Sequence, residues 1–311
     1  MTLITVLTPC YNEEQNIDEV YLQTKAIFAT IEGLEYEHLF IDNCSTDRTA
    51  ELLRKLASTD SKVKVILNAR NFGHIRSPHY ALLQAHGDAV IVLVADLQDP
   101  PELIRLFIAH WRAGSKVVVG VKPSSEESLS MFLIRRLYYR TISRISDVDL
   151  IQNFTGFGLY DRQVIEVLKK IDDPYPYFRG LISEIGFKAM QVPYNQPKRL
   201  RGITKNNFYT LYDIAMLGIT SHSRVPLRLA TMCGFALSAI SLLVSLVYLL
   251  SKLFFWDRFS FGAAPILIGM FFFASVQLFF IGLLGEYVGA ILTQVMKRPL
   301  VVEKERINFD T

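Results

Sequence analysis

The chain has 311 residues, of which 50% are hydrophobic and 20% are charged, and its formal net charge is +3. This length allows one large domain or two small ones. The small excess of positive charge argues against a strongly basic nucleic-acid-binding protein, so we expect no nucleic-acid partner.

Short apolar runs alternate with amphipathic stretches along the first 121 residues. The apolar runs predict strands at 3–8, 37–42, 63–68, 88–94 and 116–121. The amphipathic stretches predict helices at 13–31, 45–57, about 77–85 and 101–113. This alternation predicts an α/β fold with a mostly parallel sheet and helices on both of its faces.

Polar side chains follow four of the expected strands, at 11–13, 42–43, 70–71 and 96–99. Ligands bind beyond the carboxyl ends of the strands in an open parallel sheet, so these four clusters predict one continuous site. The glycine motif of dinucleotide-binding proteins does not follow the first strand, and no P-loop sequence is present. Both absences argue against a nicotinamide-dependent dehydrogenase or a P-loop enzyme.

Two long uncharged runs follow in the last third of the chain. We expect helices there at about 229–251 and 261–285, each long enough for the roughly 20 apolar residues that a bilayer core requires. They predict a transmembrane hairpin within 225–295; the alternative is a buried helical hairpin in a soluble core. Small residues in the second run allow close helix approach and predict a homo-oligomer: Gly262, Ala263, Gly269 and Ala274.

The N-terminal sequence MTLITVLTPCYNEE is typical of a strand followed by a polar loop and not of a signal peptide. We therefore expect residues 1–220 to form a cytosolic catalytic domain, and the hairpin to return a cytosolic tail at 296–311 to the same side. More basic residues flank the inner ends of the hairpin than its outer turn, as in multi-pass proteins of the inner or plasma membrane.

A further membrane contact is predicted at residues 130–146. One helical face of this segment is apolar, and the other carries Arg136, Arg140 and Arg144. This pattern favours an amphipathic helix in the plane of the membrane surface. The alternative is a surface helix that packs on the sheet.

Several motifs in order resemble those of the inverting family 2 glycosyltransferases with the GT-A fold. They are TPCYNEEQNI (8–17), IDNCSTDRT (41–49), NARNFG (68–73), ADLQDPPELI (95–104), RGITK (201–205) and KRPLVV (297–302). Within this family the chain is most similar to polyprenyl-phosphate glycosyltransferases, namely the bactoprenol glucosyltransferases and dolichol-phosphate mannose synthases. The resemblance implies a nucleotide-sugar donor and a polyprenyl-phosphate acceptor.

The first chemical expectation concerns a metal at 95–99. If this segment is extended, Asp96 and Gln98 point the same way and can bind Mg²⁺ or Mn²⁺. Asp99 is then expected to cap the following helix, although Asp96 is an alternative cap. The resemblance also assigns Asp96 and Gln98 to the metal, but Val94 stands where relatives usually carry a further carboxylate.

The resemblance implies a donor site along the first strand ends. It assigns the nucleoside pocket to Pro9, Tyr11, Glu13 and Asp42, and places Asp96 and Arg70 near the donor phosphates, with support of the uridine as an alternative role for Arg70. Asn43 stands where an aspartate is usual. Glu13 has an alternative role as a negative charge near the start of a helix.

The acceptor phosphate requires cations. The basic loop PKRLRGITK (197–205) carries them, and the resemblance favours Arg199 and Lys205 as the main contacts, with Arg201 and Arg179 beside them. Together with Asp96, Arg199 and Lys205 would stabilise charge during transfer. The alternative is a basic patch that attracts anionic lipids.

The expected reaction is inverting transfer of a sugar, with glucose favoured, from a UDP-sugar to undecaprenyl or another polyprenyl phosphate, which gives a β-linked product. The acceptor phosphate is already ionised, so no strong general base is required. One alternative is transfer of mannose from GDP-mannose. The other is an inactive scaffold that binds nucleotide sugar or lipid, which the valine at position 94 motivates.

Overall fold

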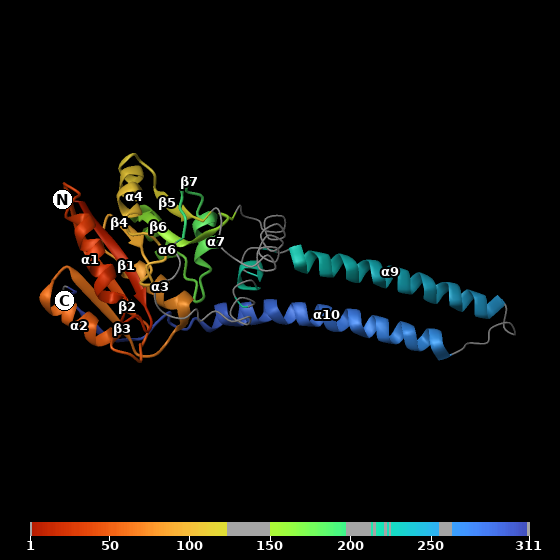
Figure 1. Ribbon diagram of the computed structural model, residues 1–311. Coiled ribbons are helices and arrows are strands. Elements are labelled where there is room, and N and C mark those ends of the chain that lie inside the picture. Colours follow the sequence, from red (N-terminus) through yellow and green to blue (C-terminus); the bar gives the residue numbers. More distant parts are fainter. Residues whose placement is uncertain are drawn as a thin grey trace.

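The computed structural model describes residues 2–122, 150–196, 213, 216–220, 223, 225–254 and 263–309. A globular part carries two long helices that extend from it side by side (Figure 1). The helix expected at 130–146 and the basic loop at 197–205 lie outside the described residues.

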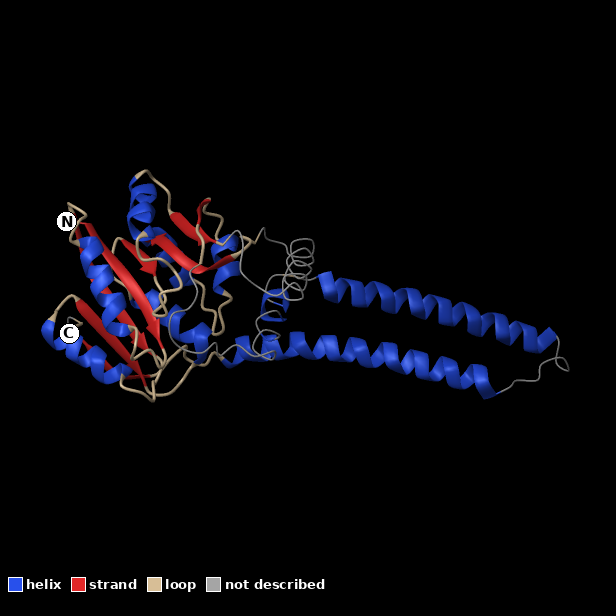
Figure 2. Ribbon diagram, in the orientation of Figure 1, coloured by secondary structure: helices blue, strands red, loops and turns tan. Residues whose placement is uncertain are grey.

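One mixed sheet of eight strands forms the centre of the globular part (Figure 2). Its order is β7-β5-β6-β4-β1-β2-β3-β8. The strands are β1 (Thr2–Cys10), β2 (Leu34–Asp42), β3 (Val63–Asn68), β4 (Ala89–Val92), β5 (Val117–Val121), β6 (Phe154–Asp161), β7 (Ala189–Pro193) and β8 (Glu303–Ile307). Strands β6 and β8 pair antiparallel with their neighbours, and the other pairs are parallel. The predicted mostly parallel sheet is confirmed.

Helices cover both faces of this sheet. The first face packs against α1 (Ile17–Phe28), α2 (Thr49–Thr59) and α4 (Leu103–Arg112). The second face packs against α3 (Gly73–Gln84), α6 (Arg162–Lys170) and α7 (Phe178–Glu184). Strands between two helical layers are buried on both sides, which is why their sequences are continuous apolar runs and do not alternate.

Helix α1 begins at Ile17, four residues after the expected start. Two further helices begin four residues from their expected starts. Helix α2 begins at Thr49 and not at 45, because residues 45–48 form a loop that hydrogen-bonds the loop after β1. Helix α3 begins at Gly73, four residues before the expected start, and contains Pro78. Both differences lie at the carboxyl ends of strands, where loop contacts override local helix signals.

Strands β6, β7 and β8 are not among the expected elements. Strand β8 pairs with β3, and its Glu305 forms an ion pair with Arg54 of α2 at 2.7 Å. Its sequence, EKERI, is largely charged, as is common in an edge strand, so it lacks the alternation typical of a buried strand. The segment expected as a tail at 296–311 therefore contributes a strand to the sheet.

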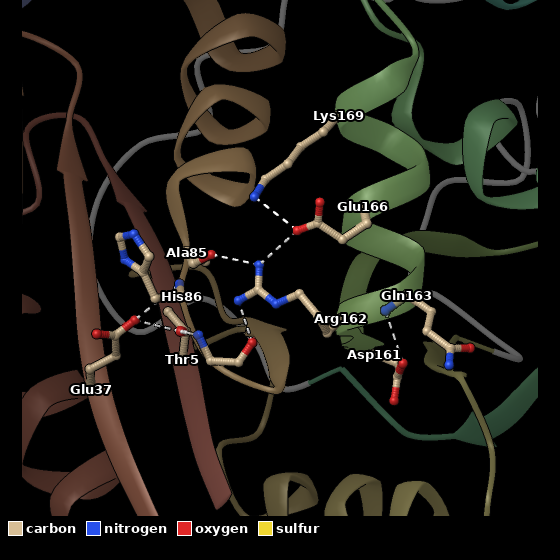
Figure 3. A network of polar contacts seen from close by, with 10 residues as sticks. Thr5, Glu37, Ala85, His86, Asp161, Arg162, Gln163, Glu166 and Lys169 are labelled. Carbon is tan, nitrogen blue, oxygen red and sulfur yellow. Dashed lines mark hydrogen bonds and ion pairs between the residues drawn. The ribbon is translucent and has the colours of Figure 1, made fainter.

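A polar network fastens the edge of the sheet where β4 begins and β6 ends (Figure 3). Arg162 donates to the carbonyl of Ala85 at 2.9 Å and to the carbonyl of Gly87. The Gly87 N–H donates to Thr5 Oγ1 at 2.9 Å, and Thr5 in turn donates to Glu37 at 2.6 Å. The opposite edge, where the parallel strands end, carries the polar clusters predicted from the sequence.

The two long helices are α9 (Val225–Phe254) and α10 (Ala263–Met296). Among the described residues, Gly269–Met296 is the stretch long and apolar enough to cross a membrane, with a mean hydropathy of 1.7; Val225–Ser241 is a shorter apolar stretch. Large apolar side chains on both helices are exposed, such as Phe235 at 73% and Leu278 at 68%. The second expected span stays a prediction.

Polar interactions within the described part of the chain hold the C-terminal end of α10 and the residue after it. Tyr287 donates to the Ser223 carbonyl at 2.9 Å, and Gln294 donates to Asp173 at 2.8 Å. Lys297 forms an ion pair with Asp172 at 3.0 Å. These contacts hold the last turns of α10, and strand β8, which follows α10 in the chain, is part of the sheet.

Candidate active site

The carboxyl ends of the parallel strands bring the predicted residues to one edge of the sheet. Cys10 and Asp42 are register partners at the ends of β1 and β2. A cavity of about 200 Å³ opens beside them, and Pro9, Val94 and Arg179 are among its lining residues. Three of the segments singled out in the sequence therefore meet at one cavity.

Asp42 is held by the turn that follows β2. It is 2% exposed and accepts hydrogen bonds from the Ser45 N–H at 3.1 Å and from the Ser45 hydroxyl. Burial raises the pKa of Asp42, and the Ser45 hydrogen bonds oppose that rise. The turn thus fixes the orientation of this carboxyl group.

The loop after β1 is fastened to the same turn. Asn12 has a left-handed φ of 56°, which asparagine tolerates better than most residues. Its N–H donates to Ser45 Oγ at 2.8 Å, and its side-chain oxygen accepts from the Thr46 N–H at 2.7 Å. The Glu13 N–H donates to Thr49 Oγ1 at 2.9 Å. The position of Tyr11, which directly precedes Asn12, is set by these contacts.

The Glu13 carboxylate accepts a hydrogen bond from Asn16 Nδ2 at 2.7 Å, and Asn16 is the residue before α1. This contact is consistent with the alternative role of Glu13 at a helix start. It leaves the proposed nucleoside contact of Glu13 untested.

Asn43 organises the loop between β3 and α3. Its amide nitrogen donates to Asn71 Oδ1 at 2.9 Å and to the Gly73 carbonyl at 3.1 Å. Its oxygen accepts from the Phe72 N–H at 2.9 Å and from Asn68 Nδ2 at 3.1 Å. An aspartate has no N–H to donate, so this network accounts for the asparagine where relatives usually carry an acid.

Asp96 lies in a tight turn and not on an extended segment. Leu97 has a φ of 56°, and the Gln98 N–H donates to Asp96 Oδ1 at 3.1 Å. The expectation that alternate side chains of an extended segment point the same way is therefore wrong here. The spacing of Asp96 and Gln98 therefore does not support a shared metal. Their assignment to a metal now depends only on the resemblance to family 2 glycosyltransferases.

Asp99 does not cap the next helix as predicted. Helix α4 begins at Leu103 with Glu102 before it, whereas the Asp99 side chain accepts a hydrogen bond from the Tyr194 hydroxyl. Lys122 Nζ lies 3.8 Å from the same carboxylate. Asp99 is too far from the helix to cap it, because Pro100, Pro101 and Glu102 lie between Asp99 and the start of α4 at Leu103.

Asp99, Lys122 and Tyr194 form a buried polar group that the sequence reasoning missed. Burial raises the pKa of Asp99, and Lys122 opposes this rise. Burial also lowers the pKa of Lys122, against the attraction of Asp99 and Asp96. Lys122 directly follows β5. Its place at a strand end, like those of the four polar clusters, was the signal in the sequence that could have identified it.

The donor set around Asp96 fits a metal only in part. The described residues hold no group of three or more His, Cys, Asp or Glu side chains that could form a complete metal site. Magnesium, however, is often held by one or two carboxylates together with substrate phosphates. Asp96 therefore fits a divalent ion that shares its ligands with a bound diphosphate.

The predicted basic site residues do not all lie together. Two of them line two different cavities, and the other three belong to the part of the chain that the structure does not describe. Arg179, in α7, lines the cavity beside Pro9. Arg70 lines a different cavity, together with Arg76 and Arg298. The predicted acceptor residues Arg199, Arg201 and Lys205 lie outside the described residues.

The sequence matches the family described as Glycosyl transferase family 2 over residues 5–169, more than half of the chain. The chain belongs to this family. The predicted resemblance is thereby confirmed, and the mostly parallel sheet is the GT-A arrangement expected for a family 2 glycosyltransferase.

Relatives match this glycosyltransferase over nearly its whole length. An uncharacterized glycosyltransferase, YkcC, from Bacillus subtilis is 35% identical, over 98% of this chain and 94% of its own. The SfII prophage-derived bactoprenol glucosyl transferase from Shigella flexneri is 33% identical, over 97% of each chain. A solved structure of glucosyl-3-phosphoglycerate synthase from Mycobacterium tuberculosis has a TM-score of 0.47 and 16% identity, over 70% of this chain and 76% of that one.

Proposed function

We propose that this glycosyltransferase transfers a hexose, with glucose favoured, from a UDP-sugar to undecaprenyl or another polyprenyl phosphate, with inversion at the anomeric carbon. The observation that carries the proposal is the match over 97% of the chain to relatives named bactoprenol glucosyl transferase. Bactoprenol is a polyprenol, and the presence of Asp42 and Asp96 at the strand-end edge supports a donor site there.

The described residues can be assigned roles in this reaction. Pro9, Tyr11 and Asp42 would form the nucleoside side of the donor site, with Glu13 as a further donor contact; Arg70, which the resemblance placed near the donor, lies at a separate cavity. Asp96, with Gln98 beside it, would hold Mg²⁺ or Mn²⁺ on the donor diphosphate, where the ion stabilises charge on the leaving group. Arg179 lines the cavity next to this position. It would orient the acceptor phosphate with Arg199, Arg201 and Lys205.

The sheet topology supports a hairpin of two membrane spans. Residues before α9 form most of the sheet, and β8 after α10 joins the same sheet. Both ends of the α9–α10 pair are therefore on one side of any membrane that the pair enters. If α10 crosses the bilayer, α9 has to cross it as well, and the strands before α9 and strand β8 then lie on the same side. We propose that this side is the cytosol. Association of several copies through the small residues of α10 remains part of this proposal.

A donor panel tests the proposed function. Purified full-length protein in detergent is supplied with undecaprenyl phosphate, Mg²⁺ or Mn²⁺, and UDP- or GDP-sugars, and release of nucleotide diphosphate and the mass of the lipid product are followed. We expect a hexosyl lipid with UDP-glucose, loss of turnover with EDTA, and loss in Asp96→Ala. Turnover with GDP-mannose alone would overturn the donor assignment, and binding without turnover of any donor would favour the scaffold alternative.

A further inference from the structure

A second, basic cavity of about 320 Å³ lies where two segments far apart in the sequence meet, residues 69–76 and 298–302. Arg70 follows β3, Arg76 belongs to α3, and Arg298 lies between α10 and β8. The other lining residues include Phe72, Pro299 and Val302, and none of the lining residues is acidic. The cavity therefore concentrates positive charge without a built-in counter-charge.

The three arginines have few partners. Among the described residues none of them forms an ion pair. The Arg70 guanidinium lies 4.0 Å from the centre of the Phe72 ring and donates to the Asn71 carbonyl at 3.0 Å. Arg76 lies 5.3 Å from the centre of the Tyr175 ring, and its Nε is buried without a hydrogen-bond partner. Three like charges that share one cavity repel one another, and a bound anion would relieve that repulsion.

The backbone holds Arg298 at this cavity. The Ala69 N–H donates to the Val302 carbonyl at 2.9 Å, and Asn68 pairs with Glu303 at the start of β8. On the other side, α10 ends at Met296, two residues before Arg298. The segment is thus pinned at both ends. The adjacent Lys297 has a different role, because it pairs with Asp172.

We infer that Arg70, Arg76 and Arg298 bind the phosphate group of an anionic ligand at a site separate from Asp42 and Asp96. Guanidinium groups present forked N–H donors that match phosphate oxygens, and aromatic faces such as Phe72 and Tyr175 keep those forks oriented. Two sources share this chemistry: the headgroup of an anionic phospholipid and a free phosphate ion. The lipid source rests on the proposed membrane position of α10; the phosphate chemistry does not.

The experiment compares two neighbouring substitutions in the full-length protein. Arg298→Gln and Lys297→Gln remove the same charge from exposed positions one residue apart, but only Arg298 lines the cavity. Binding of inorganic phosphate is measured by calorimetry in detergent. Retention of phosphatidylglycerol is measured by native mass spectrometry after reconstitution in phosphatidylcholine nanodiscs with and without that lipid. Thermal unfolding of both variants reports that each is folded.

We expect Arg298→Gln to weaken the affinity for the anion by about 10-fold or more, because at least one charge-assisted hydrogen bond is lost. Lys297→Gln should change the affinity by less than about 2-fold. Retained phosphatidylglycerol that phosphate displaces identifies the lipid source; phosphate binding without lipid retention identifies the free ion. Equal weakening by both variants, or no saturable binding of either probe, overturns the inference. Asp96→Ala should keep full phosphate affinity, so failed sugar transfer and failed anion binding are told apart.

Discussion

The two halves of the strand-end edge are built in different ways. The β1–β2 half, with Asn12, Asp42 and Asn43, is held by hydrogen bonds to side chains and backbone of neighbouring loops. The β4–β5 half places Asp96, Asp99 and Lys122 near one another, partly or fully buried.

Hydrogen bonds between well-placed neutral groups fix a shape at little cost, whereas buried charges cost desolvation energy and depend on each other. The first half is therefore suited to recognise a ligand by its outline. The second is suited to stabilise charge. Substitutions in the two halves should then fail in different ways. Three experiments test that difference, and a fourth tests the dependence of stability on pH.

The largest effect is expected from Lys122→Met in the β4–β5 half. Loss of this cation removes a positive charge that attracts both Asp99 and Asp96, so turnover should fall by about 100-fold, as for loss of one electrostatic contact in an active site. Lys116→Met is the matched control, because Lys116 precedes the same strand but pairs with Asp161 at the opposite edge, at 3.2 Å. Steady-state turnover of the hexosyl lipid measures both. Equal losses in the two variants would contradict an electrostatic role for Lys122.

Asn43→Asp tests the β1–β2 half. The new carboxylate cannot donate to Asn71 and Gly73, and it is placed against their oxygens, so the variant should lose about 2–3 kcal/mol of stability. Asn12→Asp makes the same chemical change where the side chain only accepts, from Thr46, and should cost little. Thermal unfolding in detergent measures both. Similar melting temperatures for the two variants would show that donation by Asn43 is unimportant.

Tyr194→Phe tests whether the negative charge of Asp99 strengthens its hydrogen bond with Tyr194 in the β4–β5 half. The Tyr194 hydroxyl donates to a buried carboxylate, so its loss should cost about 1.5–3 kcal/mol. Tyr160→Phe removes a hydroxyl that donates to the neutral Gly156 carbonyl at 2.8 Å and should cost about 1 kcal/mol. Denaturant or thermal unfolding measures the difference. A larger loss in Tyr160→Phe would argue against the charged character of the Asp99 group.

The fourth prediction concerns the dependence of folding stability on pH. Burial lowers the pKa of His38 to about 3 and that of His79, at the cavity, to about 4, from an ordinary 6.5. The unfolded chain therefore binds more protons below about pH 6.5, so stability is present above that pH and is lost as pH falls toward 4. Each histidine contributes at most about 1.4 kcal/mol per pH unit in this window.

Melting temperatures of the full chain between pH 7 and 5 measure this loss. His79→Gln removes one of the three histidines whose pKa burial lowers, His38, His74 and His79, and should make the dependence of stability on pH less steep. An unchanged slope in His79→Gln would mean that this histidine is hydrated in the folded protein.

Much of the fold could be predicted because it depends on local sequence. Apolar runs flanked by polar strand ends are a one-dimensional signal, and β3 was predicted with its observed bounds at 63–68. Strand β8 could not be predicted in this way, because a charged edge strand acquires its structure only by pairing with β3, more than 200 residues earlier in the chain.

The site shows the same division. The sequence by itself determined which polar residues stand at the ends of strands, and so it placed Asp42 and Asp96 at one edge of the sheet. Only the tertiary structure decided that Asp96 lies in a turn, that Asp99 bonds Tyr194, and that Lys122 joins them. Strand ends follow from hydrophobic pattern along the chain, whereas loop conformation and charge pairing depend on contacts between segments that the pattern does not encode.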